Sequence, residues 1–254
     1  MRRLLLGLVI ALASLQVTAG QLAIIIDDIG YRHSDEDALS LPSGITLSVI
    51  PHTPLGKKLA QEAHAKGHEI MVHLPMQALN GKDMGPGGLN NKMSEQDFKH
   101  AVEDALSSVP YAKGSNNHMG SLLTQLDQPM KWLMEVLRSE NLYFVDSLTT
   151  RYSKASSEAH TFNVPLLKRQ VFLDNQKSTA ALERQLQQAM QLAKRLGQAV
   201  LIAHPYPETV KFLKQQLKPQ LQQQGVELVK ASELLSFQFA NKEAAKKDNN
   251  KEQL

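Results

Sequence analysis

Acidic and imidazole side chains recur in this sequence at or near the end of short apolar runs, where buried strands deliver catalytic groups. Asp and His bind Zn²⁺ through oxygen and nitrogen, and histidine exchanges protons near neutral pH. Carboxylates and imidazoles that meet around a divalent cation are suited to metal-assisted hydrolysis. The candidate residues are Asp27, Asp28, His73, His118, Asp146, Asp174 and His204.

Two adjacent acids, Asp27 and Asp28, follow the first apolar run at 22–26, and Gly30 comes shortly after them. Successive side chains of a strand point to opposite faces, so one carboxylate can bind a metal while its neighbour takes a proton. The alternative is a helix N-cap followed by a solvated acid. The pair is therefore a candidate start of a site that later strands must complete.

Three histidines occupy comparable positions on later runs. His73 lies near the end of the run at 69–75, although a lone histidine at a strand end is often a hydrogen-bonded structural residue. His118 lies in a polar run rich in hydrogen-bond donors. His204 follows an apolar run at 199–203, so we expect its imidazole at a buried rim, where it could protonate a leaving group.

Four further polar residues near these positions could orient the site or bind substrate. Asn116 and Asn117 could orient ligands or hold substrate carbonyls, and simple turn chemistry is the alternative. Asp146 and Asp174 could fix the orientation of a histidine or bind sugar hydroxyls, and each could equally be structural.

The segments that must position these side chains alternate between strand-like and helix-like patterns, which predicts an α/β fold with a parallel sheet. Strands are expected at 22–26, 45–50, 69–75, 142–147, 171–175, 199–205 and 226–229, with a weak strand leading into the polar run at 114–121. Helices are expected at 55–66, 94–108, 128–140, 179–196 and 209–223. The carboxyl ends of parallel barrel strands share one mouth, so the candidate residues should meet there.

The length and composition fit one such barrel. The chain has 254 residues, and an α/β barrel takes about 200–250. The net charge of +3 is small and the basic residues are scattered, so no nucleic-acid partner is expected. The sequence contains no cysteine, which excludes disulfides and thiol chemistry.

The two ends of the chain differ in character from the middle. Two arginines at 2–3, an apolar run at 4–15 and small residues at 17–19 follow the order of a secretory signal peptide, predicted to span 1–20 with cleavage near Ala19 or Gly20. A membrane anchor is the alternative, but the run is shorter than the roughly 20 residues of a membrane span. We therefore expect export to the periplasm, without a stable membrane anchor after cleavage. Residues 237–254 are predicted to be a disordered polar tail, since the chain is rich in Lys, Asn and Glu from 241 onward.

Six motifs of the sequence, in order, resemble those of a known family. They are Ile25-Ile26-Asp27-Asp28-Ile29-Gly30, His73-Leu74-Pro75-Met76, Asn116-Asn117-His118-Met119-Gly120-Ser121, Phe144-Val145-Asp146-Ser147, Phe172-Leu173-Asp174-Asn175 and Ala203-His204-Pro205. The sequence is similar to the divergent polysaccharide deacetylases, exported bacterial relatives of the metal-dependent sugar de-N-acetylases. The resemblance covers a domain at 21–236. It implies a single-domain, distorted (β/α) barrel of about seven parallel strands and a divalent metal, usually zinc.

The resemblance also implies roles for individual residues. Asp27 matches the catalytic base of polysaccharide deacetylases, Asp28 and His73 match metal ligands, and His204 matches the general acid. The sequence departs from the usual pattern at Gln77, where a second histidine ligand normally stands four residues after the first. It departs again where Asn116–Ser121 replace an Arg- and Pro-containing motif. We infer that His118 is the third metal ligand, with Asn117 near it.

The function expected from the sequence is an exported metal-dependent hydrolase that removes acetyl groups from an N-acetylated envelope glycan. Asn116, Asn117, Asp146 and Asp174 are expected to bind substrate or orient the site. Two alternatives stay open. The protein could be a non-catalytic relative that uses the barrel mouth to bind a glycan or a protein, or a metal hydrolase that acts on a different bond.

Overall fold

The computed structural model describes residues 19–236 of the chain. The predicted signal peptide at 1–20 therefore lies almost entirely outside the described residues, and so does the predicted tail at 237–254. Among the described residues, the helices are too short or too polar to cross a membrane.

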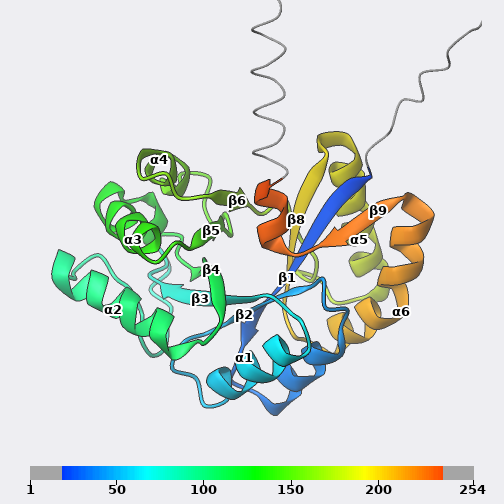
Figure 1. The fold of residues 1–254 in the computed structure, drawn as a ribbon, viewed down its shortest axis with the longest axis horizontal. Coiled ribbons are helices and arrows are strands. Elements are labelled where there is room, and N and C mark those ends of the chain that lie inside the picture. Colours follow the sequence, from blue (N-terminus) through cyan, green and yellow to red (C-terminus); the bar gives the residue numbers. More distant parts are fainter. Residues whose placement is uncertain (1–18, 237–254) are drawn as a thin grey trace, which may run out of the picture.

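A curled, nine-stranded parallel sheet forms the centre of the molecule (Figure 1). The sheet order is β6-β5-β4-β3-β2-β1-β8-β7, and β9 pairs with the first half of β1. The strands are β1 (Gly20–Ile29), β2 (Thr46–Val49), β3 (Ile70–Met76), β4 (Ala112–Met119), β5 (Tyr143–Asp146), β6 (Leu166–Lys168), β7 (Val171–Phe172), β8 (Gln198–Ala203) and β9 (Val226–Val229). This architecture confirms the expected α/β class, the barrel-like curl and the single domain.

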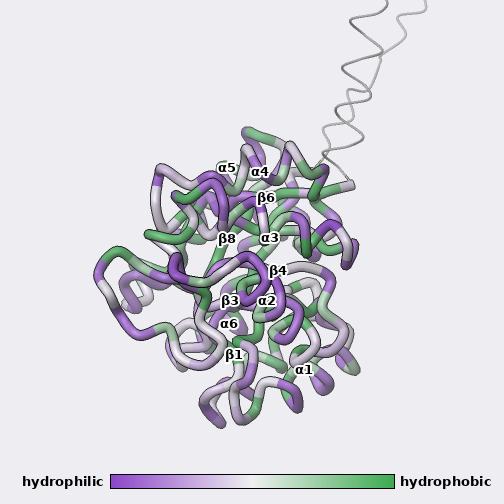
Figure 2. Tube along the Cα trace, turned by 90° about the vertical axis from the view of Figure 1, so that its left-hand side faces the viewer, coloured by the Kyte–Doolittle hydropathy of each residue, from purple (hydrophilic) through white to green (hydrophobic). Residues whose placement is uncertain are grey.

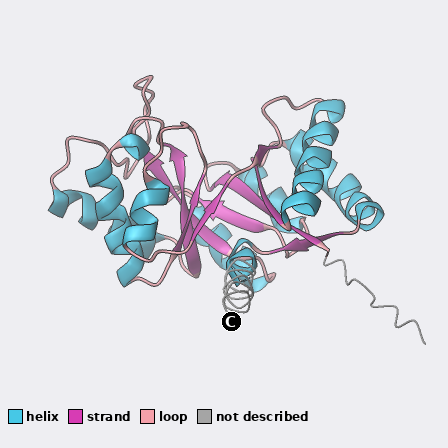
Figure 3. Ribbon diagram, turned by 90° about the horizontal axis from the view of Figure 1, so that it is seen from above, coloured by secondary structure: helices cyan, strands magenta, loops and turns pink. Residues whose placement is uncertain are grey.

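Helices cover the outside of the sheet and flank the strands on both sides when the molecule is seen from above (Figure 3). The α-helices are α1 (Gly56–Ala65), α2 (Glu95–Ser108), α3 (Asp127–Ser139), α4 (Ala155–Thr161), α5 (Thr179–Leu196) and α6 (Pro207–Gln224). Two 3₁₀ helices are η1 (His33–Ser40) and η2 (Leu123–Gln125). The five helices expected from the apolar periodicity are present, and α4 and both 3₁₀ helices are additional.

The sheet has more strands than the seven or so that the resemblance implied. The strand that was not expected is β6, which is three residues long, whereas β7 lies within the expected strand at 171–175 and is only two residues long. Segments this short are too brief to show a two-residue period in the sequence. They are the two ends of the sheet path, and within residues 19–236 no backbone pairing joins β6 to β7. The barrel is therefore curled but open at this seam.

Strands β1, β3, β5 and β8 pack apolar side chains on both faces. On β1, Leu22, Ile24 and Ile26 belong to the large core beneath the helices, whereas Ala23 and Ile25 belong to a second cluster. This alternation follows from the two-residue period of a strand. Figure 2 shows hydrophobic segments along the interior strands and hydrophilic segments at the surface.

The second cluster, which we call the inner core, fills the concave side of the sheet. Its buried members are Ala23, Ile25, Met71, Tyr143, Val145, Leu167, Val200, Ile202, Val229, Ala231, Leu234 and Leu235. The last three come from the helical turn at 231–236, which closes the amino-terminal end of the barrel. The inner core thus lies beneath the side chains at the carboxyl ends of the strands and supports them.

Candidate metal and catalytic site

Strand register brings the candidate residues to one place. His73 pairs with Asn116 and Pro75 with His118 across β3 and β4, while Ile26 pairs with Ala203 across β1 and β8. All these strands are parallel, so their carboxyl ends lie at the same mouth of the barrel. Asp27 and His73 stand two residues beyond members of the inner core, and therefore face the same concave side.

A break in the regularity of β1 lets both adjacent acids reach this mouth. The pairing of β1 with β2 shifts register between Ile26 and Ile29, and Asp28 has a positive φ of 61°. A bulge of this kind redirects a side chain, and Asp tolerates the left-handed region better than most residues. As a result Asp28 turns back toward the same imidazole that Asp27 faces: His73 Nε2 lies 3.2 Å from Asp28 Oδ1 and 3.6 Å from Asp27 Oδ2.

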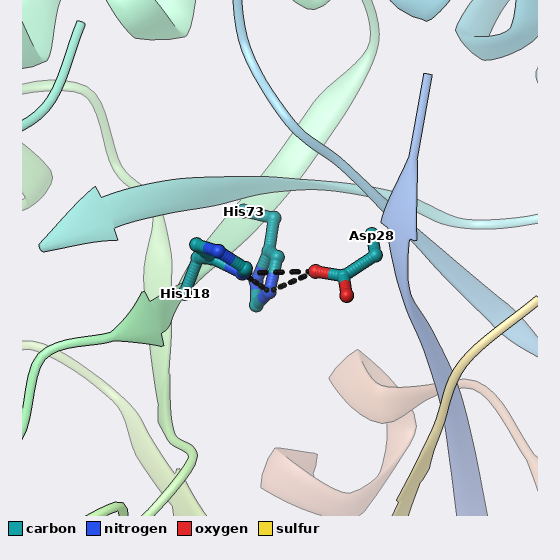
Figure 4. Close-up of side chains that lie close together, drawn as sticks. All are labelled: Asp28, His73 and His118. Atoms are coloured by element: carbon teal, nitrogen blue, oxygen red, sulfur yellow. Dashed lines mark hydrogen bonds and ion pairs between the residues drawn. The ribbon is translucent and has the colours of Figure 1, made fainter. Parts of the chain in front are cut away.

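Three potential ligand atoms from β1, β3 and β4 converge at this point (Figure 4). Asp28 Oδ1 lies 2.9 Å from His118 Nδ1 and 3.2 Å from His73 Nε2, and the two nitrogens are 3.2 Å apart. In a tetrahedral zinc site with bonds of about 2.0 Å, neighbouring ligand atoms stand about 3.3 Å apart. The spacing of this triad therefore fits a small divalent cation.

The hydrogen bonding of the triad also fits an ion. Asp28 Oδ1 is buried and has no hydrogen-bond partner of normal geometry among the described residues, although two ring nitrogens lie close to it. A buried carboxylate oxygen without a donor is costly unless a cation satisfies it. Oxygen and imidazole nitrogen are ligands that Zn²⁺ accepts. Asp28, His73 and His118 could therefore hold such a metal.

The electrostatics of the triad agree with this assignment. Burial raises the pKa of Asp28, but the contacts and charges of His118 and His73 outweigh it and hold that pKa below its ordinary value. Burial lowers the pKa of His73, while the charge of Asp27 and the contact with Asp28 raise it to a net value above 6.5. The carboxylates thus favour a positive charge at this point, which a proton or a metal ion can supply.

Asp27 lies beside the triad and is 2% exposed. Both of its carboxylate oxygens accept hydrogen bonds from Asn116 Nδ2, at 2.8 and 3.0 Å. Burial raises the pKa of Asp27, although the charges of His73 and His204 and the bond from Asn116 act against that rise. A carboxylate with a raised pKa is better matched to proton transfer than an ordinary one.

His204 also lies near the triad, directly after the last residue of β8. Its Nε2 lies 4.0 Å from Asp28 Oδ2, and its Nδ1 lies 2.8 Å from Asp174 Oδ1. The other oxygen of Asp174 accepts hydrogen bonds from the His204 backbone amide and from the Thr209 hydroxyl. Both oxygens of Asp174 therefore contact His204, one at its backbone amide and one at its ring.

Asn117 and Asp146 have partners outside the triad instead. Asn117 is 1% exposed; its Oδ1 accepts from the Ser147 backbone amide and its Nδ2 donates to the Met119 carbonyl. Asp146 is also 1% exposed, and its Oδ1 accepts from the Leu148 backbone amide. Neither side chain contacts the triad in the described structure, so their predicted substrate contacts stay predictions.

Gln77, at the position where a second histidine was expected in ordinary deacetylases, holds a loop. Its side-chain Oε1 accepts from the Asn91 backbone amide at 2.9 Å, and its backbone carbonyl accepts from Leu122 and Leu123. Gln77 thus closes the base of the long loop at 77–91. The side chain that completes the triad comes from the next strand, as His118.

A cavity of about 200 Å³ opens beside the triad. Its wall includes Asp28, His118 and His204, together with residues that sequence reasoning missed: Tyr31, Arg32, Asp35, Ile50, Pro205 and Tyr206. Asp35 Oδ2 accepts the backbone amides of Gly30 and Arg32, and so fixes the turn that presents Tyr31. The two tyrosines could have been found from their closeness in the sequence to the candidate residues. Tyr31 comes three residues after Asp28, and Tyr206 comes two residues after His204.

The fold and site define an α/β barrel protein with a candidate metal centre at the carboxyl mouth. Residues 24–235 match the family described as divergent polysaccharide deacetylase. The uncharacterized protein YibQ of Escherichia coli strain K12 is 40% identical over 224 residues, which cover 87% of this chain and 69% of that protein. The chain belongs to the divergent polysaccharide deacetylase family.

Two solved structures show the same fold. The uncharacterized protein ATU2773 from Agrobacterium tumefaciens C58 superposes with a TM-score of 0.81 at 21% identity, over 85% of this chain and 89% of that chain. A BA3943 mutant, described as a CE4 family pseudoenzyme with restored enzymatic activity, gives a TM-score of 0.50 at 12% identity, over 85% and 68% of the two chains. At these identities the likeness concerns the fold.

Proposed function

We propose that this protein is an exported, metal-dependent hydrolase that removes acetyl groups from an N-acetylated glycan of the cell envelope. One observation carries the proposal: the ligand atoms of Asp28, His73 and His118 converge within 2.9–3.2 Å of one another, beside the buried carboxyl group of Asp27 and the imidazole of His204. Membership of the divergent polysaccharide deacetylase family supports a glycan as the substrate.

Asp28, His73 and His118 would hold the metal, and we propose Zn²⁺ from the mixed oxygen and nitrogen donors. When bound, such an ion supplies positive charge that polarises the amide carbonyl and makes water easier to deprotonate at neutral pH. The three ligands lie at the mouth of the barrel, next to the cavity, so a substrate amide can approach them.

Asp27 takes the proton from the attacking water. Its carboxylate is held by two hydrogen bonds from Asn116 and lies 3.6 Å from His73, on the inner side of the triad. Its raised pKa makes it a stronger base than a solvated aspartate. The water oxygen adds to the amide carbon as its proton moves to Asp27.

His204 gives a proton to the leaving nitrogen. Asp174 and the nearby acids raise its pKa to about 9 against the opposing effect of burial, so the ring is protonated at neutral pH. As the nitrogen accepts this proton the carbon–nitrogen bond breaks, and the products are acetate and the free amine of the sugar. The cycle closes when Asp27 loses, and His204 regains, a proton through solvent.

The cavity walls suit a sugar ring. Tyr31, at 46% exposure, and the half-buried Tyr206 offer aromatic surface, and Arg32 offers hydrogen-bond donors to hydroxyl or acidic groups. The cavity lies directly beside His118 and His204, so a ring bound there would place its acetamido group at the proposed reacting centre.

Export is the proposed location, supported by the order of basic, apolar and small residues at 1–20. A fusion of residues 1–30 to a reporter that is active only outside the cytoplasm would test it. A second fusion would carry replacements of Arg2 and Arg3 and charged residues in the run at 4–15. We expect this second fusion to lose reporter activity. Equal activity of the two fusions would contradict export by this segment.

The central experiment measures metal content and acetate release on the same purified protein. Wild type should hold about one divalent ion per chain and release acetate from N-acetylated glycans, while His118→Ala should lose both. The matched control is His160→Ala, which removes an exposed histidine on α4 and should retain metal and activity.

The same experiment separates the proposal from its alternatives. A protein without stoichiometric metal and without acetate release, but with affinity for glycans, would be a non-catalytic binding relative. Acetate release from O-acetylated glycans alone would make it an esterase. Either result would overturn the proposed amide hydrolysis.

A further inference from the structure

A buried polar layer lies directly above the inner core, and Asn116 is at its centre. The layer consists of Asp27, Ser48, His73 and Asn116, each at most 2% exposed. Asn116 is fully buried, donates to both oxygens of Asp27, and accepts from the Ser48 hydroxyl at 2.7 Å. Its Oδ1 also lies 2.7 Å from His73 Nδ1. One amide therefore contacts the proposed base and one proposed ligand at once.

The orientation of this amide is determined by its neighbours. The ionised carboxylate of Asp27, the form required of a base, accepts hydrogen bonds only, so the Nδ2 end of Asn116 must face Asp27. The Oδ1 end then faces Ser48 and His73, and its two lone pairs accept from both. Both ends of the amide therefore have buried partners, Asp27 at Nδ2 and Ser48 and His73 at Oδ1. A reversed amide would place two acceptors against each other beside Asp27, at a substantial cost in a buried site.

This orientation assigns the proton of His73. Because Asn116 Oδ1 is an acceptor, His73 Nδ1 must carry the hydrogen that joins them. In a neutral imidazole the lone pair is then on Nε2. Nε2 is the atom that lies 3.2 Å from Asp28 Oδ1 and 3.2 Å from His118 Nδ1, at the point of convergence.

We propose that Asn116 is a positioning residue that fixes the Nδ1–H tautomer of His73, so that Nε2 is the metal-binding atom, and at the same time holds Asp27 beside it. The inference rests on the metal site of the proposed function. Of the two roles expected from the sequence, it favours orienting the site over binding substrate, since Asn116 has no exposed surface and is not part of the cavity wall. Asn116 acts through other side chains and does not touch substrate.

The residue type follows from this arrangement. The position needs a short side chain with a donor end for the acid and an acceptor end for the imidazole, which asparagine supplies. Aspartate would set a second carboxylate against Asp27, and leucine would leave Asp27 and His73 Nδ1 without partners. Ser48 fixes the acceptor end from the neighbouring side, because its hydroxyl donates to the same oxygen.

The first test is the ¹⁵N spectrum of wild-type protein with ¹⁵N-labelled histidine, loaded with Zn²⁺. The His73 signals, assigned by comparison with His73→Gln, should show hydrogen on Nδ1 and metal on Nε2, with slow exchange of the Nδ1 hydrogen. Hydrogen on Nε2 and metal on Nδ1 would overturn the inference. A wild-type protein that binds no Zn²⁺ would overturn it together with the metal part of the proposed function.

The second test is the Zn²⁺ dissociation constant of three variants. Asn116→Ala should weaken binding about 10–100-fold, the usual effect of losing a residue that orients a ligand. Ser48→Ala, which keeps the amide and removes one of its bonds, should weaken it less, and supplies the answer if Asn116→Ala does not fold. The control is Ser115→Ala on the same strand, since Ser115 is equally buried and its hydroxyl has no hydrogen-bond partner among the described residues.

Equal affinities in Asn116→Ala and Ser115→Ala would overturn the inference. These measurements use no glycan, so they test the role of Asn116 separately from the proposed deacetylase activity. Tight Zn²⁺ binding through His73 Nε2 without acetate release would contradict the deacetylase and leave the role of Asn116 intact. Acetate release with metal on His73 Nδ1 would contradict the role of Asn116 and leave the deacetylase activity intact.

Discussion

The carboxylate of Asp174 holds His204 by two separate contacts. Its Oδ2 accepts the backbone amide hydrogen of His204 at 2.7 Å, and its Oδ1 lies 2.8 Å from the ring Nδ1. The first contact fixes the chain at the end of β8, and the second fixes the ring and its charge. The side chain that we propose as proton donor is therefore set by a residue 30 positions earlier in the sequence.

Replacing Asp174 with asparagine should lower the pKa of His204. Burial lowers that pKa, whereas the hydrogen bond and charge of Asp174 and the charges of Asp28 and Asp27 raise it to about 9. The substitution preserves the size of the side chain and removes its charge. An NMR titration of metal-free protein should show the His204 ring titrating near pH 9 in wild type and clearly lower in the variant. Identical titration curves would contradict the role of Asp174.

The same shift predicts how stability depends on pH. The pKa of His204 in the folded protein lies above its ordinary value of 6.5, so the folded state binds the proton more tightly than the unfolded state. This contribution is fully present below about pH 6.5 and is lost as the pH rises through about 9. Urea unfolding of metal-free wild type should show a free energy that falls across this range, and Asp174→Asn should show a smaller fall.

Asp28 should be required for metal binding. Asp28→Asn removes the carboxylate charge that faces both His73 and His118, at 3.2 and 2.9 Å. Zn²⁺ at about 100 times its dissociation constant should stabilise wild type by about 2.7 kcal/mol, because it binds the folded state only. Thermal unfolding with and without Zn²⁺ should show this rise in wild type and little or none in Asp28→Asn. A full rise in the variant would remove Asp28 from the ligand set.

Asp27 should be required for the reaction and dispensable for the metal. Asp27→Asn keeps a group that can accept one hydrogen bond from Asn116, but it can no longer take a proton. The rate of acetate release should fall about 10²–10⁴-fold, the usual effect of losing a general base, with metal content unchanged. Metal content measured in both variants is the check, since Asp28→Asn should lose the metal and Asp27→Asn should keep it. Loss of metal in both variants would mean that both acids are ligands.

Tyr31 should contribute to binding of the sugar. Its ring lines the cavity beside the triad and is 46% exposed, and aromatic contacts are worth about 0.5–1.5 kcal/mol. Tyr31→Ala should therefore raise KM about 2- to 10-fold with kcat nearly unchanged. Tyr152→Ala is the control, because Tyr152 is 57% exposed and does not line the cavity. Equal KM values for the two variants would mean that the sugar binds elsewhere.

The sequence by itself determined most of the strands and the residues that end them. The runs at 22–26, 69–75 and 199–203 are mostly apolar and long enough to be recognised as buried strands. An ionisable residue at or near the end of such a run has few places to lie except the rim of the sheet. For the same reason His73 and His204 could be selected from the nine histidines of the chain, whereas His118 was selected from the polar run at 114–121. These features depend on neighbours in the chain, which the sequence shows directly.

The tertiary structure decided which atoms meet. The bulge that turns Asp28 back toward His73 depends on how β1 pairs with β2, and the contact of Asn116 with Asp27 joins residues 89 positions apart. The same packing places Gln77 at the base of a loop and gives Asp146 only local partners. A displacement of one residue in strand register reverses which face a side chain takes. The direction of each side chain was therefore set by contacts between strands that lie far apart in the sequence.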